Sequence, residues 1–135
     1  MATFHVTLFY AGFLGLLLVV LSFNMTKNWV RATAAGQPSD PDLRRAEALV
    51  TSFTDYVPLT LLLMAMLEST GAVPGILHVL GSMLLVARLL HAFGSNRLGG
   101  ADGMRFLGTQ LTYLVMTIAS FGCLYVYAIP ALIVK

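Results

Sequence analysis

The residues of this chain that could do chemistry are a few charged and hydroxyl side chains within otherwise apolar sequence. At 100° per residue along a helix, Arg44, Thr51 and Asp55 fall on one side, with Ser52 beside them. An ionisable group such as Asp55 at membrane depth is costly, and it usually marks an internal site with a cationic partner. The alternative is an ion pair that only holds helices together.

A second group of candidate residues lies between positions 88 and 105. Arg88, His91 and Ser95 share one helical face, at i, i+3 and i+7. His91 has no second histidine or carboxylate at ligand spacing, so no metal site is predicted, and a hydrogen-bonded interface histidine is the alternative. Arg105 either belongs to a site or anchors its helix at the membrane surface.

Arginines gather at one end of the expected helices. They are Arg44, Arg45, Arg88, Arg97 and Arg105. Guanidinium groups bind carboxylates bidentately, so this end is expected to hold an anionic ligand that carries carboxylates. Apolar clefts beneath it would suit a lipophilic second molecule.

The segments that would position these residues are four membrane-spanning helices. The chain has 135 residues, of which 58% are hydrophobic and 10% charged, whereas a soluble domain is roughly one quarter charged. Charge-free stretches and helix breakers predict a single all-α domain over 1–135, with helices at about 4–31, 43–69, 75–95 and 104–133. Asp40 or Asp42 is expected to cap the second helix.

Net charge and cysteine content exclude other classes. The formal net charge is +2 and no basic patch is present, which argues against a nucleic-acid partner. Cys123 is the sole cysteine, so an intrachain disulfide is excluded, and its apolar surroundings predict an inert buried thiol.

Basic residues predict the orientation in the membrane. The connections between the first two and the last two helices hold Lys27, Arg31, Arg44, Arg45, Arg97 and Arg105. The turn between the second and third helices holds none. By the positive-inside rule the basic connections face the cytoplasm, and both termini then lie on the other side.

Two stretches of the chain resemble the signature regions of a known family. Positions 49–68 read LVTSFTDYVPLTLLLMAMLE, and positions 81–109 contain ARLLHAFG and MRFLGT. Both are similar to the MAPEG family, the membrane-associated proteins in eicosanoid and glutathione metabolism. The resemblance covers the last three helices. It implies a homotrimer of four-helix subunits with glutathione in a cleft between neighbouring subunits, near their cytoplasmic ends.

The second helix matches the family motif in part. That motif is an arginine, three residues, an asparagine, two residues, and then Glu-Tyr-x-Pro. Tyr56 and Pro58 match it, and Asp55 keeps the carboxylate with one methylene fewer. Ala48 and Ser52 stand in place of the arginine and the asparagine, both of which bind glutathione in the family. Glutathione binding is therefore expected to need another cation.

The third and fourth helices carry the remaining family positions. By the resemblance, Arg88 matches a family arginine, and His91 and Ser95 stand where eicosanoid members carry a tyrosine or histidine that touches the cofactor. Arg105 corresponds to the arginine that stabilises the glutathione thiolate. A free thiol has a pKa of about 8.5, so a nearby guanidinium is needed to favour the nucleophilic form at neutral pH.

Two functions from different classes are compatible with this resemblance. The first is a glutathione-dependent transferase or peroxidase that acts on lipophilic electrophiles in a bacterial-type inner membrane, with Arg105 as the catalytic residue. The residues expected to bind glutathione are Arg44 or Arg45 in place of the missing arginine, with Ser52, Asp55, Tyr56, Arg88, His91 and Ser95. The second is a non-catalytic lipid-binding or scaffolding protein that has lost the cofactor site at Ala48 and Ser52. A small transporter subunit, suggested by Asp55 alone, is a third.

Overall fold

The computed structural model of the chain describes residues 4–94 and 102–133, and every regular element within these ranges is an α-helix. The helices are α1 (His5–Ala34), α2 (Pro41–Ser69), α3 (Pro74–Gly94) and α4 (Asp102–Ile133). All four are long and apolar enough to cross a membrane. The expected all-α membrane bundle is confirmed. The helix α1 runs a few residues beyond its expected end at about position 31.

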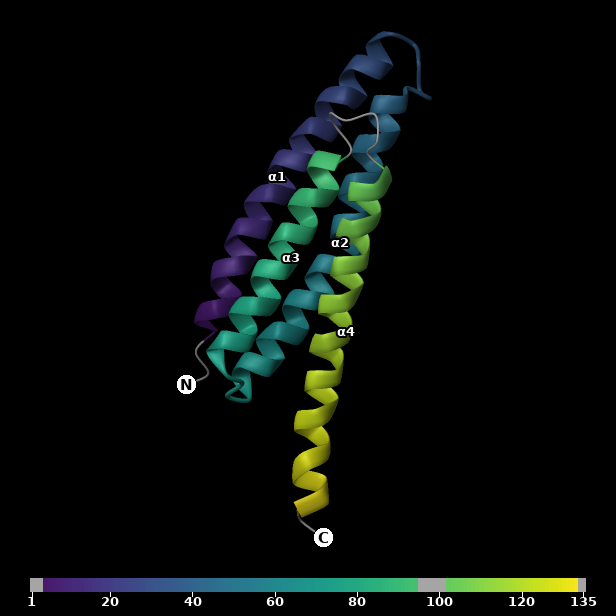
Figure 1. Cartoon of the computed structure of the whole chain (residues 1–135). Coiled ribbons are helices and arrows are strands. Elements are labelled where there is room, and N and C mark those ends of the chain that lie inside the picture. The colour runs from purple at the N-terminus through teal and green to yellow at the C-terminus, as the bar shows by residue number, and fades with distance from the viewer. Residues whose placement is uncertain (1–3, 95–101, 134–135) are drawn as a thin grey trace.

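The helices run alternately up and down, and α2 and α3 stand between the other two (Figure 1). The helix α1 contacts α2 and α3, α4 contacts the same two helices, and α1 and α4 do not touch within the described residues. The connection from α1 to α2 lies at the same end of the bundle as the end of α3 and the start of α4 (Figure 1). We call this end the hairpin end. It is where the sequence places most of the arginines.

The start of α2 is determined by local sequence. Asp40 is its N-cap, and the Asp40 side chain accepts a hydrogen bond from the backbone amide of Asp42 at 2.8 Å. Pro41 follows at the first helical position. An amide at this position has no acceptor within the helix, so the missing amide hydrogen of proline costs no hydrogen bond. Of the two aspartates expected as caps, Asp40 is the one that caps.

The core consists of apolar side chains from all four helices. Leu14, Met64, Leu84 and Val115 are completely buried at its centre. Apolar burial does not by itself drive helices together in lipid, so close packing and small residues matter more than in water. A Cβ atom built on Gly108 of α4 would lie 2.6 Å from the carbonyl oxygen of Ala87 on α3, which shows how closely these two backbones approach.

Polar groups join the helices at the end opposite the hairpin end. The Glu68 carboxylate of α2 accepts hydrogen bonds from the amides of Val6 and Thr7 in α1, at 2.8 and 2.9 Å. The Tyr10 hydroxyl donates to the backbone carbonyl of His78 at 3.1 Å. The first amides of a helix have no partner within the helix, so Glu68 supplies acceptors that lipid cannot provide.

Candidate functional site

The guanidinium of Arg88 lies inside the bundle between α2 and α3. Arg88 is only 3% exposed, and its Nη1 donates to the backbone carbonyl and the hydroxyl of Ser52, each at 3.2 Å. The guanidinium carbon is 5.7 Å from the ring centre of Phe53 and 5.9 Å from that of Tyr56. Among the described residues no carboxylate pairs with it and its Nε has no partner. Arg88 therefore positions Ser52 and Tyr56 from within.

His91 is held between α3 and α4. It is buried, and its Nδ1 lies 3.3 Å from the hydroxyl of Thr109, which itself donates to the carbonyl of Arg105 at 3.0 Å. Either the Thr109 hydroxyl or Nδ1 is the donor of this contact, depending on the imidazole tautomer. Nε2 has no hydrogen-bond partner in the described part of the chain. The side chains of His91 and Arg88 both line a gap that is too narrow for a water molecule. His91 therefore faces the interior of the helix bundle.

Three polar residues of α2 and α4, Asp55 and two tyrosines, are at least partly exposed. The hydroxyls of Tyr56 on α2 and Tyr113 on α4 lie 3.2 Å apart, and their rings meet edge to face at 5.3 Å. Asp55 and Tyr113 are exposed, and Tyr56 is half-buried. We call these three residues the outer cluster. It lies within helices that are apolar enough to cross a membrane.

Asp55 is exposed in this single chain, and the cationic partner expected for it is not found among the described residues. Asp55 makes no ion pair within the ranges that the structure describes. It lies two residues from each of Phe53 and Val57, which are buried, and two residues turn a helix by roughly 200°. The side chain therefore points away from the protomer core and its inward-facing Arg88. An arginine partner from a neighbouring subunit stays a prediction.

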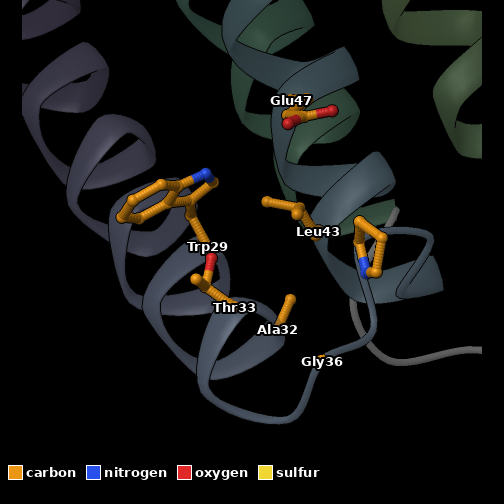
Figure 2. A pocket seen from close by; sticks show the side chains of 7 residues that line it. Trp29, Ala32, Thr33, Gly36, Leu43 and Glu47 are labelled. Atoms are coloured by element: carbon orange, nitrogen blue, oxygen red, sulfur yellow. The ribbon is translucent and has the colours of Figure 1, made fainter.

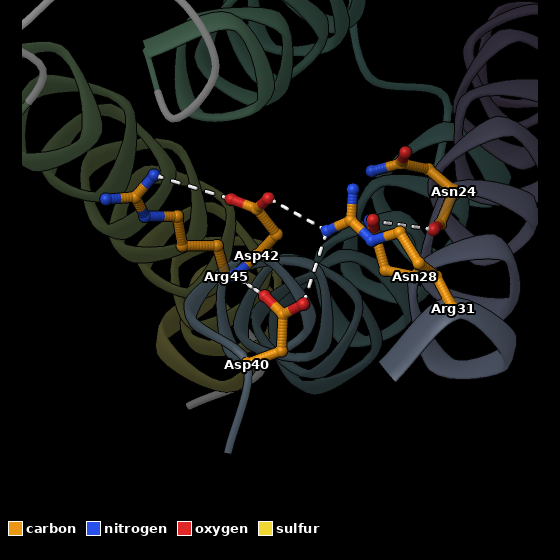
Figure 3. Close-up of polar contacts among 6 residues, drawn as sticks. All are labelled: Asn24, Asn28, Arg31, Asp40, Asp42 and Arg45. Atoms are coloured by element: carbon orange, nitrogen blue, oxygen red, sulfur yellow. Dashed lines mark hydrogen bonds and ion pairs between the residues drawn. The ribbon is translucent and has the colours of Figure 1, made fainter. Parts of the chain in front are cut away.

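The two arginines at the start of α2 differ in their surroundings, and Arg45 is the one that joins the ion pairs drawn in Figure 3. Arg45 lies 3.8 Å from Asp42, which also pairs with Arg31 at 2.9 Å. Arg31 bonds Asp40 as well, at 3.3 Å. Arg44 is exposed and has no ion pair in the part of the chain described. Of the two candidates for the missing cation, Arg44 is the one available to a ligand.

Arg105 begins α4 beside the end of α3. It is half-buried, and a Cβ atom on Gly94 would lie 3.2 Å from the Arg105 amide nitrogen. This close packing fixes the backbone at Arg105 relative to α3, and Thr109, one turn further along α4, contacts His91 of α3. Ser95, which was expected to bind glutathione, and Arg97 lie outside the described residues.

Tyr113 is a site residue that sequence reasoning did not select. It lies among apolar residues on α4, and 57 positions separate it from Tyr56. A weak signal existed, because polar side chains recur on that side of the helix at Gln110 and Thr117. Nothing in the sequence indicated that this side would meet Tyr56.

Comparison with known proteins agrees with this architecture. The MAPEG family model matches residues 7–125 of the chain. The inner membrane protein YecN of Escherichia coli strain K12 is 30% identical over 90 residues, which cover 66% of this chain and 69% of that protein. YecN of Escherichia coli O6:H1 strain CFT073 is similar to the same extent. No solved structure is a significant match.

Proposed function

The chain belongs to the MAPEG family, and we propose that it is a glutathione-dependent transferase or peroxidase acting on lipophilic electrophiles in the membrane. The observation that carries the proposal is the outer cluster. A carboxylate exposed on a membrane-spanning helix is costly when it faces lipid. Asp55 precedes Tyr56, whose hydroxyl meets that of Tyr113, and this exposed carboxylate therefore needs both a covering chain and a polar ligand.

The covering chain in this proposal is a second copy of the protein, within a homotrimer. The outer cluster lies on α2 and α4, and in the assembly a neighbouring subunit would close over it. An arginine of that neighbour would then face Asp55. This arrangement is supported by family membership and by the exposure of Asp55 in the single subunit.

Glutathione would lie along α2 between the outer cluster and the hairpin end. Arg44 precedes Asp55 by three helical turns on nearly the same side, about 16 Å along the axis. Arg44 would bind a glutathione carboxylate, and Asp55 would bind the ammonium of the γ-glutamyl group. Ser52 and Tyr56 would add hydrogen bonds to glutathione. Arg88, which contacts both residues from the interior of the bundle, would hold them in position. His91 holds the start of α4 through Thr109, and Ser95 would complete the site.

Arg105 supplies the catalytic step in this proposal. Its guanidinium would stabilise the thiolate of glutathione, and the sulfur would attack an electrophilic carbon to form a carbon–sulfur bond as the leaving group departs. In the peroxidase reaction two glutathiones supply the two electrons. They become a disulfide, and the lipid hydroperoxide becomes an alcohol and water.

The proposed location is the inner membrane, which is also the location given in the name of the YecN relatives. In the proposed orientation the hairpin end, with Arg31, Arg44 and Arg45, faces the cytoplasm. Both termini then lie on the opposite side. This places the glutathione site at the side where a cytoplasmic thiol can enter.

One observation favours the non-catalytic lipid-binding protein as a second candidate. Ala48 and Ser52 replace the two glutathione-binding side chains that the family motif carries on this helix. In that case the apolar surface between subunits would hold an acyl chain, and Arg105 would serve as an anchor at the membrane surface.

Calorimetric titration of the detergent-purified protein with glutathione separates the two functions. We expect saturable binding, thiolate absorbance of the bound glutathione, and conjugation of a small test electrophile. Arg105→Ala should keep the oligomer and lower conjugation by about 10²-fold or more. Arg105→Lys should not restore it, because ammonium lacks the planar fork of guanidinium. A wild-type protein that binds no glutathione and conjugates nothing would refute the enzyme and favour the lipid-binding protein.

A further inference from the structure

A hollow of about 310 Å³ lies between the last turns of α1 and the first turns of α2. Figure 2 shows its lining side chains, contributed by both helices and by the connection between them. They include Trp29, Thr33, Gly36, Pro38, Leu43 and Glu47. Its volume is at the lower end of the roughly 300–1,000 Å³ typical of small-molecule sites. None of the residues proposed to bind glutathione lines it.

The hollow has a fixed shape because the hairpin around it is held from several sides. Ala32 and Leu43 are buried and bring the two helices together. Gly36 turns the chain with a φ of 66°, a conformation that suits glycine. Arg31 lies two residues from Trp29, roughly 200° around α1, and pairs with two aspartates at the start of α2. These ion pairs tie the hairpin on the side away from the hollow.

The chemistry of the lining suits an organic cation. Glu47 is exposed, and its carboxylate makes no ion pair or hydrogen bond with any residue that the structure describes. The indole of Trp29 is 55% exposed and presents an aromatic surface to the same space (Figure 2). The Thr33 hydroxyl adds a further acceptor. No lysine or arginine is among the lining residues. A carboxylate beside an indole face attracts a cation by charge and by cation–π interaction.

We propose that this hollow binds the headgroup of a membrane phospholipid that carries a primary ammonium. A primary ammonium has three hydrogens to donate, and the carboxylate of Glu47, which is unpaired among the described residues, can accept them. A quaternary ammonium has none. A lipid is the fitting source because tryptophan favours the membrane–water boundary and Trp29 lies near the end of a spanning helix.

Trp29 provides the test, because it is the single tryptophan in the sequence. The full-length protein in a nonionic detergent is titrated with a short-chain phosphatidylethanolamine while its emission maximum and its quenching by acrylamide are followed. We expect a saturable shift to shorter wavelength and less quenching. The matching short-chain phosphatidylcholine should bind at least about tenfold more weakly, because it cannot donate hydrogen bonds to the carboxylate.

Two variants of equal charge change test the role of the carboxylate. Glu47→Gln should weaken the response to phosphatidylethanolamine at least about tenfold. Asp102→Asn removes a carboxylate at the start of α4, outside the hollow, and should leave the response unchanged. Circular dichroism of both variants, with an unchanged melting curve, establishes that they are folded.

Several outcomes would overturn the proposal. The first is an unchanged emission spectrum in wild-type protein, and the second is an equal response in Glu47→Gln. The third is equal binding of phosphatidylcholine, which would remove the selectivity for a primary ammonium. The fourth is equal binding of free phosphoethanolamine, which would make a soluble amine the ligand. All of these results are independent of glutathione binding, so they leave the proposed enzyme function untouched.

Discussion

Replacing Gly108 by alanine is expected to force α3 and α4 apart. The new Cβ atom would lie 2.6 Å from the carbonyl oxygen of Ala87 and 2.9 Å from the amide nitrogen of His91, whereas ordinary van der Waals contact begins at 3.4 Å. Both neighbours are backbone atoms and cannot rotate out of the way. The two helices must therefore separate by several tenths of an ångström along much of their shared length.

The magnitude follows from two opposing effects. Overpacking of a well-packed interface costs about 1–3 kcal/mol of unfolding free energy. Alanine in place of glycine within a helix contributes up to about 1 kcal/mol in the other direction. Gly12→Ala isolates the second effect, because a Cβ atom at Gly12 meets nothing within 4 Å. The two variants should therefore differ by about 1–3 kcal/mol.

The assay is thermal unfolding of wild type and both variants in one detergent, followed by circular dichroism. We expect Gly12→Ala to unfold at or slightly above the wild-type temperature, and Gly108→Ala to unfold several degrees below Gly12→Ala. Equal unfolding temperatures for the two variants would refute the close approach of α3 and α4.

Two further predictions concern the end opposite the hairpin end and the orientation of the chain. Glu68→Gln should lower the unfolding free energy by about 1–2 kcal/mol, because an amide presents one acceptor oxygen to the two α1 amides where the carboxylate presents two. The control is Ser69→Ala, because the Ser69 hydroxyl donates only to a carbonyl of its own helix. Equal unfolding temperatures for the two variants would contradict the role of Glu68 as acceptor for the first amides of α1. A reporter fused after Lys135 should lie outside the cytoplasm and one inserted near Ser39 should lie inside; the reverse pattern would refute the orientation.

The four helices were predictable from sequence because the signals that define them are local. Long charge-free stretches identify membrane spans, and turn residues identify their ends. Asp40 before Pro41 is a local capping signal, and the structure uses it. The family resemblance likewise depends on short strings around Tyr56 and Arg88, and the family match confirms it.

The partners of the site residues were less predictable. Helical periodicity placed Arg44 and Asp55 on one side of α2, but it does not say which side faces the protein interior. The side of α2 that faces the interior depends on how the neighbouring residues pack. Because Phe53 and Val57 are buried, Asp55 points outward. For this reason no arginine of the same chain pairs with Asp55 within the described residues, and a partner from a neighbouring subunit stays a prediction.

The sequence by itself determined that this protein crosses a membrane four times and to which family it belongs, since both depend on residues close together in the chain. Only the tertiary structure decided that Tyr113 meets Tyr56, that Arg88 turns inward, and that Arg45 rather than Arg44 joins the ion pairs of the hairpin. It also decided that Trp29 and Glu47 share one hollow. These contacts join different helices, and the rotation and spacing of packed helices depend on how all of their side chains fit together.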